Sequence, residues 1–386
     1  MNSDHENILH PLSRKQFFSG HWEKSPLHIE RSNPEFFSEL LSIADIEALL
    51  STGSQFFPDV QMVNSNAEIP VAEFTGDNQK IVTSGLWRHY RAGATLIVSG
   101  AARRFPKIGS LCRRVAGDLQ MRSHANVYLS PGSQQGFNAH YDTHDVFVLQ
   151  VSGCKTFRFY HSDIELPFVD DQFKPEHLSD SSVQATVQET VSLNPGDTLY
   201  IPRGVVHDAV AHSEEPSLHI TLGVYPIVVR DLLQEIVQVA SEADVSLRRS
   251  VSVRESATND RVAALQKLLT SIVNPANYEA ARARLFDEVA LDVAPSAEGQ
   301  LTATTLTNSS TISIDEKSIL SIERDESELK IRVAGQILEF SEPFASAVED
   351  LIEKKVSRVD SFKNLDEEQR LALCEQLRVA GCVFIK

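Results

Sequence analysis

The feature that most constrains the fold of this chain is a block of short, strand-like runs over residues 121–225. The runs are rich in Val, Phe, Tyr, Leu and Thr. Turn-forming residues separate them, such as Ser152-Gly153 and the Asn-Pro-Gly-Asp sequence at 194–197. Short strands at this spacing are typical of an antiparallel sandwich or barrel. We therefore predict a mainly β core in this part of the chain.

Helical periodicity replaces the strand pattern after about residue 228. Apolar side chains recur at a 3.6-like spacing over 232–239 and again over 262–272, which predicts two amphipathic helices. The pair Asn274-Pro275 predicts the end of one helix and the start of the next. A Thr-, Ser- and Ala-rich stretch over 296–311 then indicates a linker.

The last segment of the chain has a mixed pattern. An alternating run over 329–340, interrupted at Ala334-Gly335, predicts a β-hairpin. Helical patterns around 344–355 and 366–380 follow it, and residues 383–385 predict a final short strand. The predicted domains are 1–225, 226–292 and 300–386.

The net charge of −17 bears on the choice of partner. Nucleic acid repels an acidic surface unless basic residues are segregated on it. Residues 311–386 alone hold 16 Asp and Glu against 11 Lys and Arg. We therefore expect no DNA binding, and we expect the acidic surface to attract a basic protein.

The composition also predicts where the chain is found. No apolar run approaches the roughly 18–20 residues that span a bilayer, and no hydrophobic stretch follows the polar N-terminus, so neither a membrane span nor a secretory signal is expected. The four cysteines are scattered and form no CxxC pair. A reducing cytoplasmic location is the prediction.

The short sequence His140-Tyr141-Asp142 is the first candidate for chemistry. We expect it to lie in a strand, where residues i and i+2 point to the same face. His140 and Asp142 would then offer an imidazole and a carboxylate to one metal ion. A second imidazole would complete the two-histidine, one-carboxylate triad that is typical of non-haem Fe(II) oxygenases.

The second imidazole is expected from His207. It ends the run 196–207, which predicts a turn, a strand, a tight turn at Pro202-Arg203-Gly204 and a second strand. His207 follows His140 by 67 positions, which leaves room for several strands. His144 shares a strand face with Asp142 and is the best rival ligand.

A lysine next to these strands predicts an anion site. By alternation, Lys155 shares a face with Phe157 and Phe159, while Arg158 and Tyr160 point the other way. A lysine on an apolar face is costly unless an anion meets it. A dicarboxylate cosubstrate would supply that anion, with its keto-acid end on the iron and its far carboxylate on Lys155.

These residues resemble the JmjC-type oxygenases of the cupin superfamily, and specifically the ribosomal-oxygenase group. The likeness covers nearly the whole chain and includes Phe17-Phe18 and residues 21–27 near the N-terminus. The resemblance implies that the metal ligands are His140, Asp142 and His207. It implies that Lys155 binds 2-oxoglutarate, and that Asn126 and Tyr128 are the polar pair beside cosubstrate and substrate. The implied fold is a double-stranded β-helix, the cupin or JmjC jelly roll, within residues 1–225.

The resemblance also implies an activity and an assembly. The family uses Fe(II), 2-oxoglutarate and O₂ to hydroxylate side chains of ribosomal proteins, arginine in bacterial members and histidine in eukaryotic ones. The helices of 226–292 resemble its dimerisation region, and 300–386 its winged-helix domain, so a homodimer is expected. One departure is Lys155, since the bacterial arginine hydroxylases carry arginine there; this leaves the choice between arginine and histidine open.

Two other interpretations stay open at this point. The same chemistry could act on a small molecule or a peptide natural product. Alternatively, the chain could be a cupin-like binding protein without turnover. The complete triad together with Lys155 argues against the second alternative, because a binding module needs no such combination.

Overall fold

The computed structural model describes residues 7–161, 163–171, 187–212, 214–252, 256, 258–295, 305–325 and 327–385. The chain divides into two compact units. The first comprises Met1–Arg114 and Ser123–Tyr225, and the second comprises Val115–Arg122 and Pro226–Lys386. Most of the linker predicted over 296–311 lies outside the described residues.

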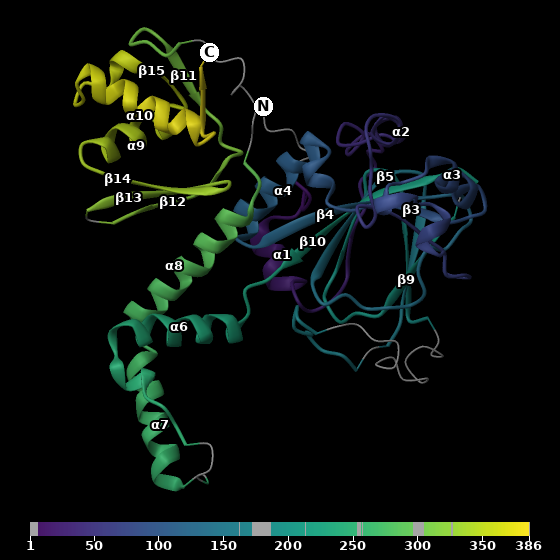
Figure 1. The fold of residues 1–386 in the computed structure, drawn as a ribbon, viewed down its shortest axis with the longest axis horizontal. Helices are drawn as coiled ribbons and strands as arrows, with labels where there is room; N and C mark the ends of the chain where they lie inside the picture. Colours follow the sequence, from purple (N-terminus) through teal and green to yellow (C-terminus); the bar gives the residue numbers. More distant parts are fainter. Residues whose placement is uncertain are drawn as a thin grey trace. The chain divides into compact units, whose positions relative to one another are not determined.

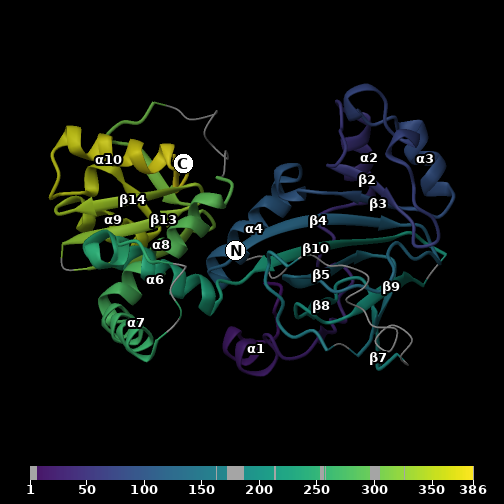
Figure 2. The same cartoon turned by 60° about the horizontal axis from the view of Figure 1, so that its bottom comes forward.

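Two antiparallel sheets form the framework of the first unit (Figures 1 and 2). The larger has the strand order β1-β8-β5-β10-β4-β3-β2, and the smaller has the order β7-β6-β9. The strands are β1 (Leu27–Ile29), β2 (Val60–Val63), β3 (Thr95–Val98), β4 (Arg122–Ser130), β5 (Asp145–Ser152), β6 (Lys155–Phe159), β7 (Glu189–Leu193), β8 (Thr198–Ile201), β9 (His207–Ala211) and β10 (Ser217–Tyr225). The helices between them are α1 (Arg14–Gly20), α2 (Ile43–Ser51), α3 (Thr83–Arg91) and α4 (Pro106–Leu119), with 3₁₀ turns η2 (Val71–Glu73), η3 (Asp77–Gln79) and η4 (Ala101–Arg103).

Alternation along the strands builds the core between the sheets. β5 pairs with β8 in the larger sheet, with Val146 opposite Ile201 and Val148 opposite Leu199. These four side chains are buried against β6 and β7 of the smaller sheet, whose contribution is Phe157, Phe159, Val191 and Leu193. The predicted mainly β core over 121–225 is confirmed.

The other face of β5 and β8 packs on the N-terminal segment. Phe147 and Tyr200 are fully buried there. The ring of Phe17, from α1, lies 5.6 Å from Phe147 and 4.9 Å from Tyr200 between centroids. Ser13 caps the N-terminus of helix α1, because its hydroxyl accepts from the N–H of Gln16. The N-terminal residues therefore belong to the same core as the central strands.

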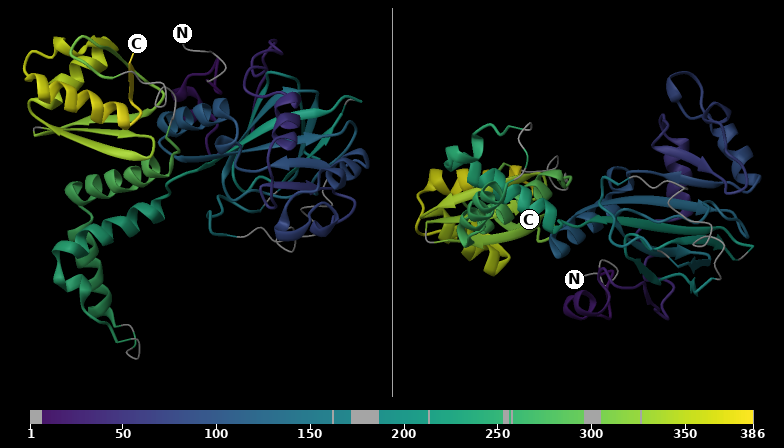
Figure 3. Two further views of the ribbon diagram at one scale, coloured as in Figure 1. Left: turned by 45° about the horizontal axis from the view of Figure 1, so that its top comes forward. Right: turned by 90° about the horizontal axis from the view of Figure 1, so that it is seen from below.

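Three helices open the second unit. They are α6 (Val229–Ala243), α7 (Asn259–Ile272) and α8 (Pro275–Asp292), with the 3₁₀ turn η6 (Val245–Arg248) after α6. Asn274 caps α8, because its side chain accepts from the N–H of Asn277, and Pro275 occupies the first turn. The helices predicted over 232–239 and 262–272 are confirmed. In Figure 3 the green helices α6 and α8 lie side by side.

The rest of the second unit has two small sheets and two helices. The sheets have the orders β15-β11-β16 and β12-β13-β14. The elements are β11 (Thr311–Ile314), β12 (Ile319–Arg324), β13 (Glu328–Val333), β14 (Gln336–Ser341), α9 (Phe344–Lys354), β15 (Val356–Arg358), η7 (Val359–Ser361), α10 (Glu367–Val379) and β16 (Val383–Ile385). The predicted hairpin is the β13–β14 pair, with Val333 opposite Gln336. The winged-helix assignment stays a prediction.

A buried arginine ties α8 to this last part. Arg332 has no exposed surface. Its Nε donates to Asp287 Oδ1 at 2.6 Å, and its Nη1 lies 2.9 Å from Glu323 Oε2. Lys330 Nζ binds the second oxygen of Asp287 at 2.8 Å. The carboxylate of Asp287 on α8 thus forms ion pairs with two cations of strand β13. None of the described helices is long and apolar enough to cross a membrane.

Candidate metal centre and cavity

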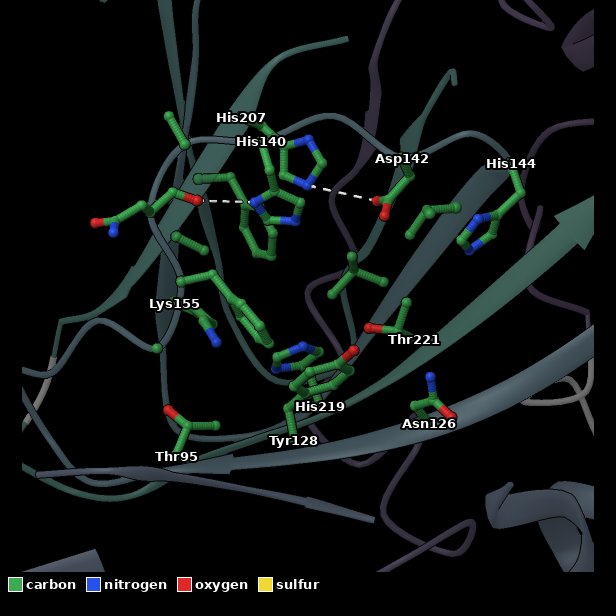
Figure 4. Close-up of a pocket in the computed structure, with 18 of the residues that line it drawn as sticks. Thr95, Asn126, Tyr128, His140, Asp142, His144, Lys155, His207, His219 and Thr221 are labelled. Atoms are coloured by element: carbon green, nitrogen blue, oxygen red, sulfur yellow. Dashed lines mark hydrogen bonds and ion pairs between the residues drawn. The ribbon is translucent and has the colours of Figure 1, made fainter. Parts of the chain in front are cut away.

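His140 and His207 face each other across a two-residue antiparallel bridge. The N–H of His140 donates to the carbonyl of His207 at 3.0 Å, and the reverse bond measures 2.8 Å. One ligand atom from each imidazole and a carboxylate oxygen of Asp142 all lie within 4.8 Å of one another. Figure 4 shows the three side chains converging at one end of a cavity. The fold therefore brings together the three residues named from the sequence.

The segment that carries Asp142 is not the predicted strand. His140 makes a single bridge, and residues 141–144 are irregular before β5 begins at Asp145. The carbonyl of Asp142 instead accepts from the N–H of Gly204 at 2.9 Å. Gly204 has a φ of +85°. Residues that carry a Cβ rarely adopt this backbone conformation, so the turn requires glycine. The strand prediction was wrong because the neighbouring turn, and not a regular ladder, binds the backbone of Asp142.

The imidazoles are oriented for metal binding through Nε2. Nδ1 of His140 lies 2.9 Å from the carbonyl of Asn138, and Nδ1 of His207 lies 3.0 Å from that of Val205. A carbonyl only accepts, so each Nδ1 carries the proton. Burial and the nearby His140 lower the pKa of His207 to about 4, which keeps its imidazole neutral. Two imidazole nitrogens and one carboxylate oxygen are the ligand set of a non-haem iron site.

Lys155 lies at another part of the same cavity wall (Figure 4). It is 5% exposed, and burial lowers the pKa of its amine to about 8. Within the part of the chain that the structure describes, its one hydrogen bond goes to Ser130 Oγ at 3.4 Å. Ser130 in turn pairs with Thr95 Oγ1 at 2.9 Å. A buried ammonium facing two hydroxyls and no carboxylate is suited to receive an anion.

The two arginines near the site have carboxylate partners of their own. Arg158 binds Asp208 through two nitrogens at 2.7 and 2.6 Å on the opposite face of β6. Arg203 Nη1 lies 3.0 Å from Asp145 Oδ2. Neither lines the cavity. Lys155 is therefore the cation available to a ligand in this cavity among the described residues.

The cavity has a volume of about 600 Å³ and lies between the two sheets. Tyr128 and His219 lie on the neighbouring strands β4 and β10 of the larger sheet and stack on each other in the cavity wall, with centroids 4.9 Å apart and an interplanar angle of 2°. Burial and Asp142 raise the pKa of Tyr128 to about 12, so it stays a neutral donor. Asn126 receives the N–H of Gly100 on its Oδ1 at 3.1 Å. The polar lining residues are Thr95, His124, Asn126, Tyr128, Asn138, His140, Asp142, His144, Lys155, His207, His219 and Thr221.

His144 does not join the candidate ligands. Its ring stacks on Tyr225 at 4.9 Å and lies 5.4 Å from the ring of His124. Both imidazoles lie over Gly223, where an added Cβ would come within 2.5 Å of His124 and 2.6 Å of His144. His124 and His144 therefore line the cavity beside Asp142, with Tyr225 packed against both rings, and His144 is not among the residues that could hold the metal.

Several residues that line the cavity or bind Lys155 were not anticipated as site residues. Thr95, Ser130, His219 and Thr221 come from β3, β4 and β10, far from the two motifs. The alternation over 217–225 places His219, Thr221 and Gly223 on one strand face, and that pattern could have indicated the β10 wall. Nothing comparable marks Thr95 or Ser130, because their place beside Lys155 depends on strand pairing.

Comparison with known proteins identifies the fold of this site. Residues 104–232 match the model of the JmjC domain, a segment that contains all three candidate ligands and Lys155. The chain contains a JmjC domain. The expected family resemblance and the double-stranded β-helix fold are thereby confirmed.

Relatives of this chain carry oxygenase or hydroxylase names. Ribosomal oxygenase 1 of Gallus gallus is 31% identical over 252 residues, which is 63% of this chain and 41% of the relative. The bifunctional lysine-specific demethylase and histidyl-hydroxylase NO66 of Drosophila mojavensis is 30% identical over 254 residues, which is 63% of this chain and 28% of the relative. The matched part is thus less than half the length of these relatives.

A solved structure matches beyond the JmjC domain. Escherichia coli YcfD, described as a ribosomal oxygenase in complex with cobalt and 2-oxoglutarate, aligns with 97% of this chain and 99% of its own, at a TM-score of 0.57 and 16% identity. At this identity the likeness concerns the fold. It extends to the helices and the small sheets of the second unit.

Proposed function

We propose that this protein is an Fe(II)- and 2-oxoglutarate-dependent oxygenase that hydroxylates a protein side chain. The observation that carries the proposal is the presence, in one cavity, of the His140, Asp142 and His207 group and the buried ammonium of Lys155. When bound, iron and 2-oxoglutarate supply the oxidation: O₂ is consumed, the cosubstrate becomes succinate and CO₂, and one oxygen atom enters a C–H bond of the substrate.

The residues of the chain contribute binding and orientation. The three ligands would hold the metal and leave positions open on the cavity side. Lys155 would pair with the far carboxylate of 2-oxoglutarate, with Ser130 and Thr95 beside it. Val146, Val148 and Phe157 line the same cavity and exclude water from the reacting groups. These contacts would fix the cosubstrate with its keto-acid end toward the metal.

The walls of the cavity favour histidine over arginine as the target side chain. Among the described residues that line it, Asp142 is the one carboxylate, and it is assigned to the metal. A guanidinium group entering such a site would be buried without a counterion, which is costly. A neutral imidazole instead finds amide, hydroxyl and imidazole partners at Asn126, Thr221 and His124. The histidyl-hydroxylase name of the NO66 relatives supports the same choice.

A ribosomal protein is the proposed source of that histidine. The support is the ribosomal-oxygenase name of the relative from Gallus gallus and the net charge of −17, which attracts basic polypeptides. The acidic balance of residues 311–386 argues against DNA as a partner. The cytoplasmic location stays a prediction of the sequence.

The helices of the second unit are proposed to form a homodimer. Helix α7 exposes Val262, Leu265 and Leu269 at 44, 59 and 51%, and α6 exposes Leu233 and Val237 at 47 and 40%. Both rows follow helical spacing. Burial of such rows against a second copy would remove apolar surface from water at about 25 cal/mol per Å².

The test of the function is intact-mass measurement of ribosomal proteins incubated with the purified protein, Fe(II) and 2-oxoglutarate. The expected result is a gain of one oxygen atom on a histidine, absent without 2-oxoglutarate or with the H207A variant. Succinate production without any modified protein would point to a small-molecule substrate. Metal and 2-oxoglutarate binding without any succinate would point to a binding protein.

A further inference from the structure

A buried arginine lies behind the candidate metal centre. Arg203 is 6% exposed and forms ion pairs with two carboxylates through the same Nη1 atom. Asp145 Oδ2 lies 3.0 Å away and Glu23 Oε1 lies 2.5 Å away. Asp145 itself has no exposed surface. The contact to Glu23 spans 180 residues of sequence.

A tyrosine closes this group. The hydroxyl of Tyr200 donates to Asp145 Oδ1 at 2.6 Å and accepts from the backbone N–H of Glu23 at 2.9 Å. Asp145 is therefore held through both of its oxygens. The residues come from three separate segments, namely the turn after α1, the start of β5, and the stretch from β8 to the turn at Gly204.

Two of these segments adjoin the candidate ligand Asp142. Asp145 follows Asp142 by three residues, and Arg203 immediately precedes Gly204, whose N–H binds the carbonyl of Asp142. The Arg203–Asp145 ion pair and the Gly204–Asp142 hydrogen bond thus cross-link the same two segments twice. Because residues 141–144 lie outside a regular strand, no continuous ladder holds Asp142.

We propose that Arg203 is a positioning residue that holds the Asp142 carboxylate in place for the metal, with Asp145 and Glu23 as its anchors. The proposal rests on the oxygenase function proposed above. The desolvation cost of a buried ion pair offsets most of its contribution to stability. Because separating the pair leaves an uncompensated buried charge, the two side chains stay in one geometry. Partners that orient metal ligands act in this way.

The test is binding of Co(II) to the purified full-length protein, followed by its d–d absorption. Arg203→Met should lower Co(II) affinity by roughly 10–100-fold, the range for partners that orient metal ligands, and should alter the band intensities. The double variant R203M/D145N leaves no unpaired buried carboxylate, and its amide oxygen still accepts from Tyr200. If R203M alone fails to fold, the Co(II) binding of the double variant is compared with that of the wild type instead. Glu23→Gln should produce a smaller loss in the same direction.

Arg31→Met is the matched control. Arg31 is a buried arginine of the same unit, 8% exposed, and binds Thr198 Oγ1 and the carbonyl of Gly196 at the opposite end of β8 from Arg203. It should leave the Co(II) affinity and spectrum unchanged.

Two results would overturn the proposal. The first is folded R203M/D145N protein that binds Co(II) with wild-type affinity and spectrum. The second is an equal loss in Arg31→Met, which would show a general effect of removing a buried guanidinium. Failure of the proposed function looks different, because the wild-type protein would then either bind no Co(II) at the triad or bind metal and 2-oxoglutarate without producing succinate.

Discussion

The backbones of His140 and His207 bind each other in both directions, with N···O distances of 3.0 and 2.8 Å. These backbone hydrogen bonds hold the two imidazoles next to each other. Removing one imidazole leaves this backbone pair intact. Ligand substitutions should accordingly affect metal binding without unfolding the chain.

The first prediction follows for the triad. H140A, D142A and H207A should each lower Co(II) or Fe(II) affinity by more than the roughly 10–100-fold typical of losing an orienting partner. Calorimetric titration under anaerobic conditions measures this. H144A is the control and should bind metal normally, since its ring stacks on Tyr225. Metal loss in H144A with normal binding in H207A would refute the assignment.

The second prediction concerns the cosubstrate. Lys155→Met should weaken 2-oxoglutarate binding by about 1.5–3 kcal/mol, or roughly ten- to a hundred-fold, because a charge-assisted contact is lost. Metal affinity should not change. Titration of the Mn(II)-loaded protein measures both. Arg158→Met serves as control, since that guanidinium is already bound to Asp208. Equal 2-oxoglutarate affinity in Lys155→Met and wild type would mean that the far carboxylate of 2-oxoglutarate does not bind Lys155.

The third prediction is a pH dependence of the same contact. Burial lowers the pKa of Lys155 to about 8, so the free protein loses the ammonium as the pH rises through that value. Affinity for 2-oxoglutarate should be constant below it and fall about tenfold per pH unit above it. Lys155→Arg should flatten this profile, because a guanidinium stays protonated. A flat wild-type profile to about pH 9.5 would contradict the burial argument.

The fourth prediction tests the helical surface. The double variant L265E/L269E should convert a dimer into a monomer in sedimentation velocity, because carboxylates replace half-exposed leucines of α7. Its far-UV circular dichroism should match the wild type. Val251→Glu changes an 82% exposed valine outside the helices and should stay dimeric. A monomeric wild type would exclude the proposed dimer.

The fifth prediction concerns the second unit. Arg332→Met should lower the free energy of unfolding by about 3–5 kcal/mol, because Asp287 and Glu323 lose a fully buried partner. Urea denaturation followed by far-UV circular dichroism measures this free energy. Arg358→Met removes an exposed pair with Asp360 and should change stability little. Equal losses of stability in Arg332→Met and Arg358→Met would mean that the buried ion pairs of Arg332 stabilise the fold no more than an exposed pair does.

The candidate site could be predicted from short motifs where the spacing of residues along one strand decides the face to which their side chains point. Lys155, Phe157 and Phe159 share a strand face, as alternation required, and all three are buried. His140 and Asp142 were paired by the same reasoning, although the segment between them is irregular. In that case the spacing identified the residues while the assumed secondary structure was wrong.

Other parts of the site depend on contacts between distant segments. The stack of Tyr128 on His219 joins β4 to β10, and the ion pair of Glu23 with Arg203 joins the N-terminal segment to the turn after β8. No periodicity within one segment encodes such pairs. They arise from the order of strands in the larger sheet, which a single sequence does not reveal.

Gly223 sets how this cavity can change. His124 and His144 occupy the space that a side chain at position 223 would need, and β10 is a central strand paired on both sides. The strand backbone cannot retreat without disturbing both neighbours, so the depth of this wall is fixed. Divergence toward bulkier or smaller substrates would therefore proceed by exchange of the two imidazoles, while position 223 stays glycine.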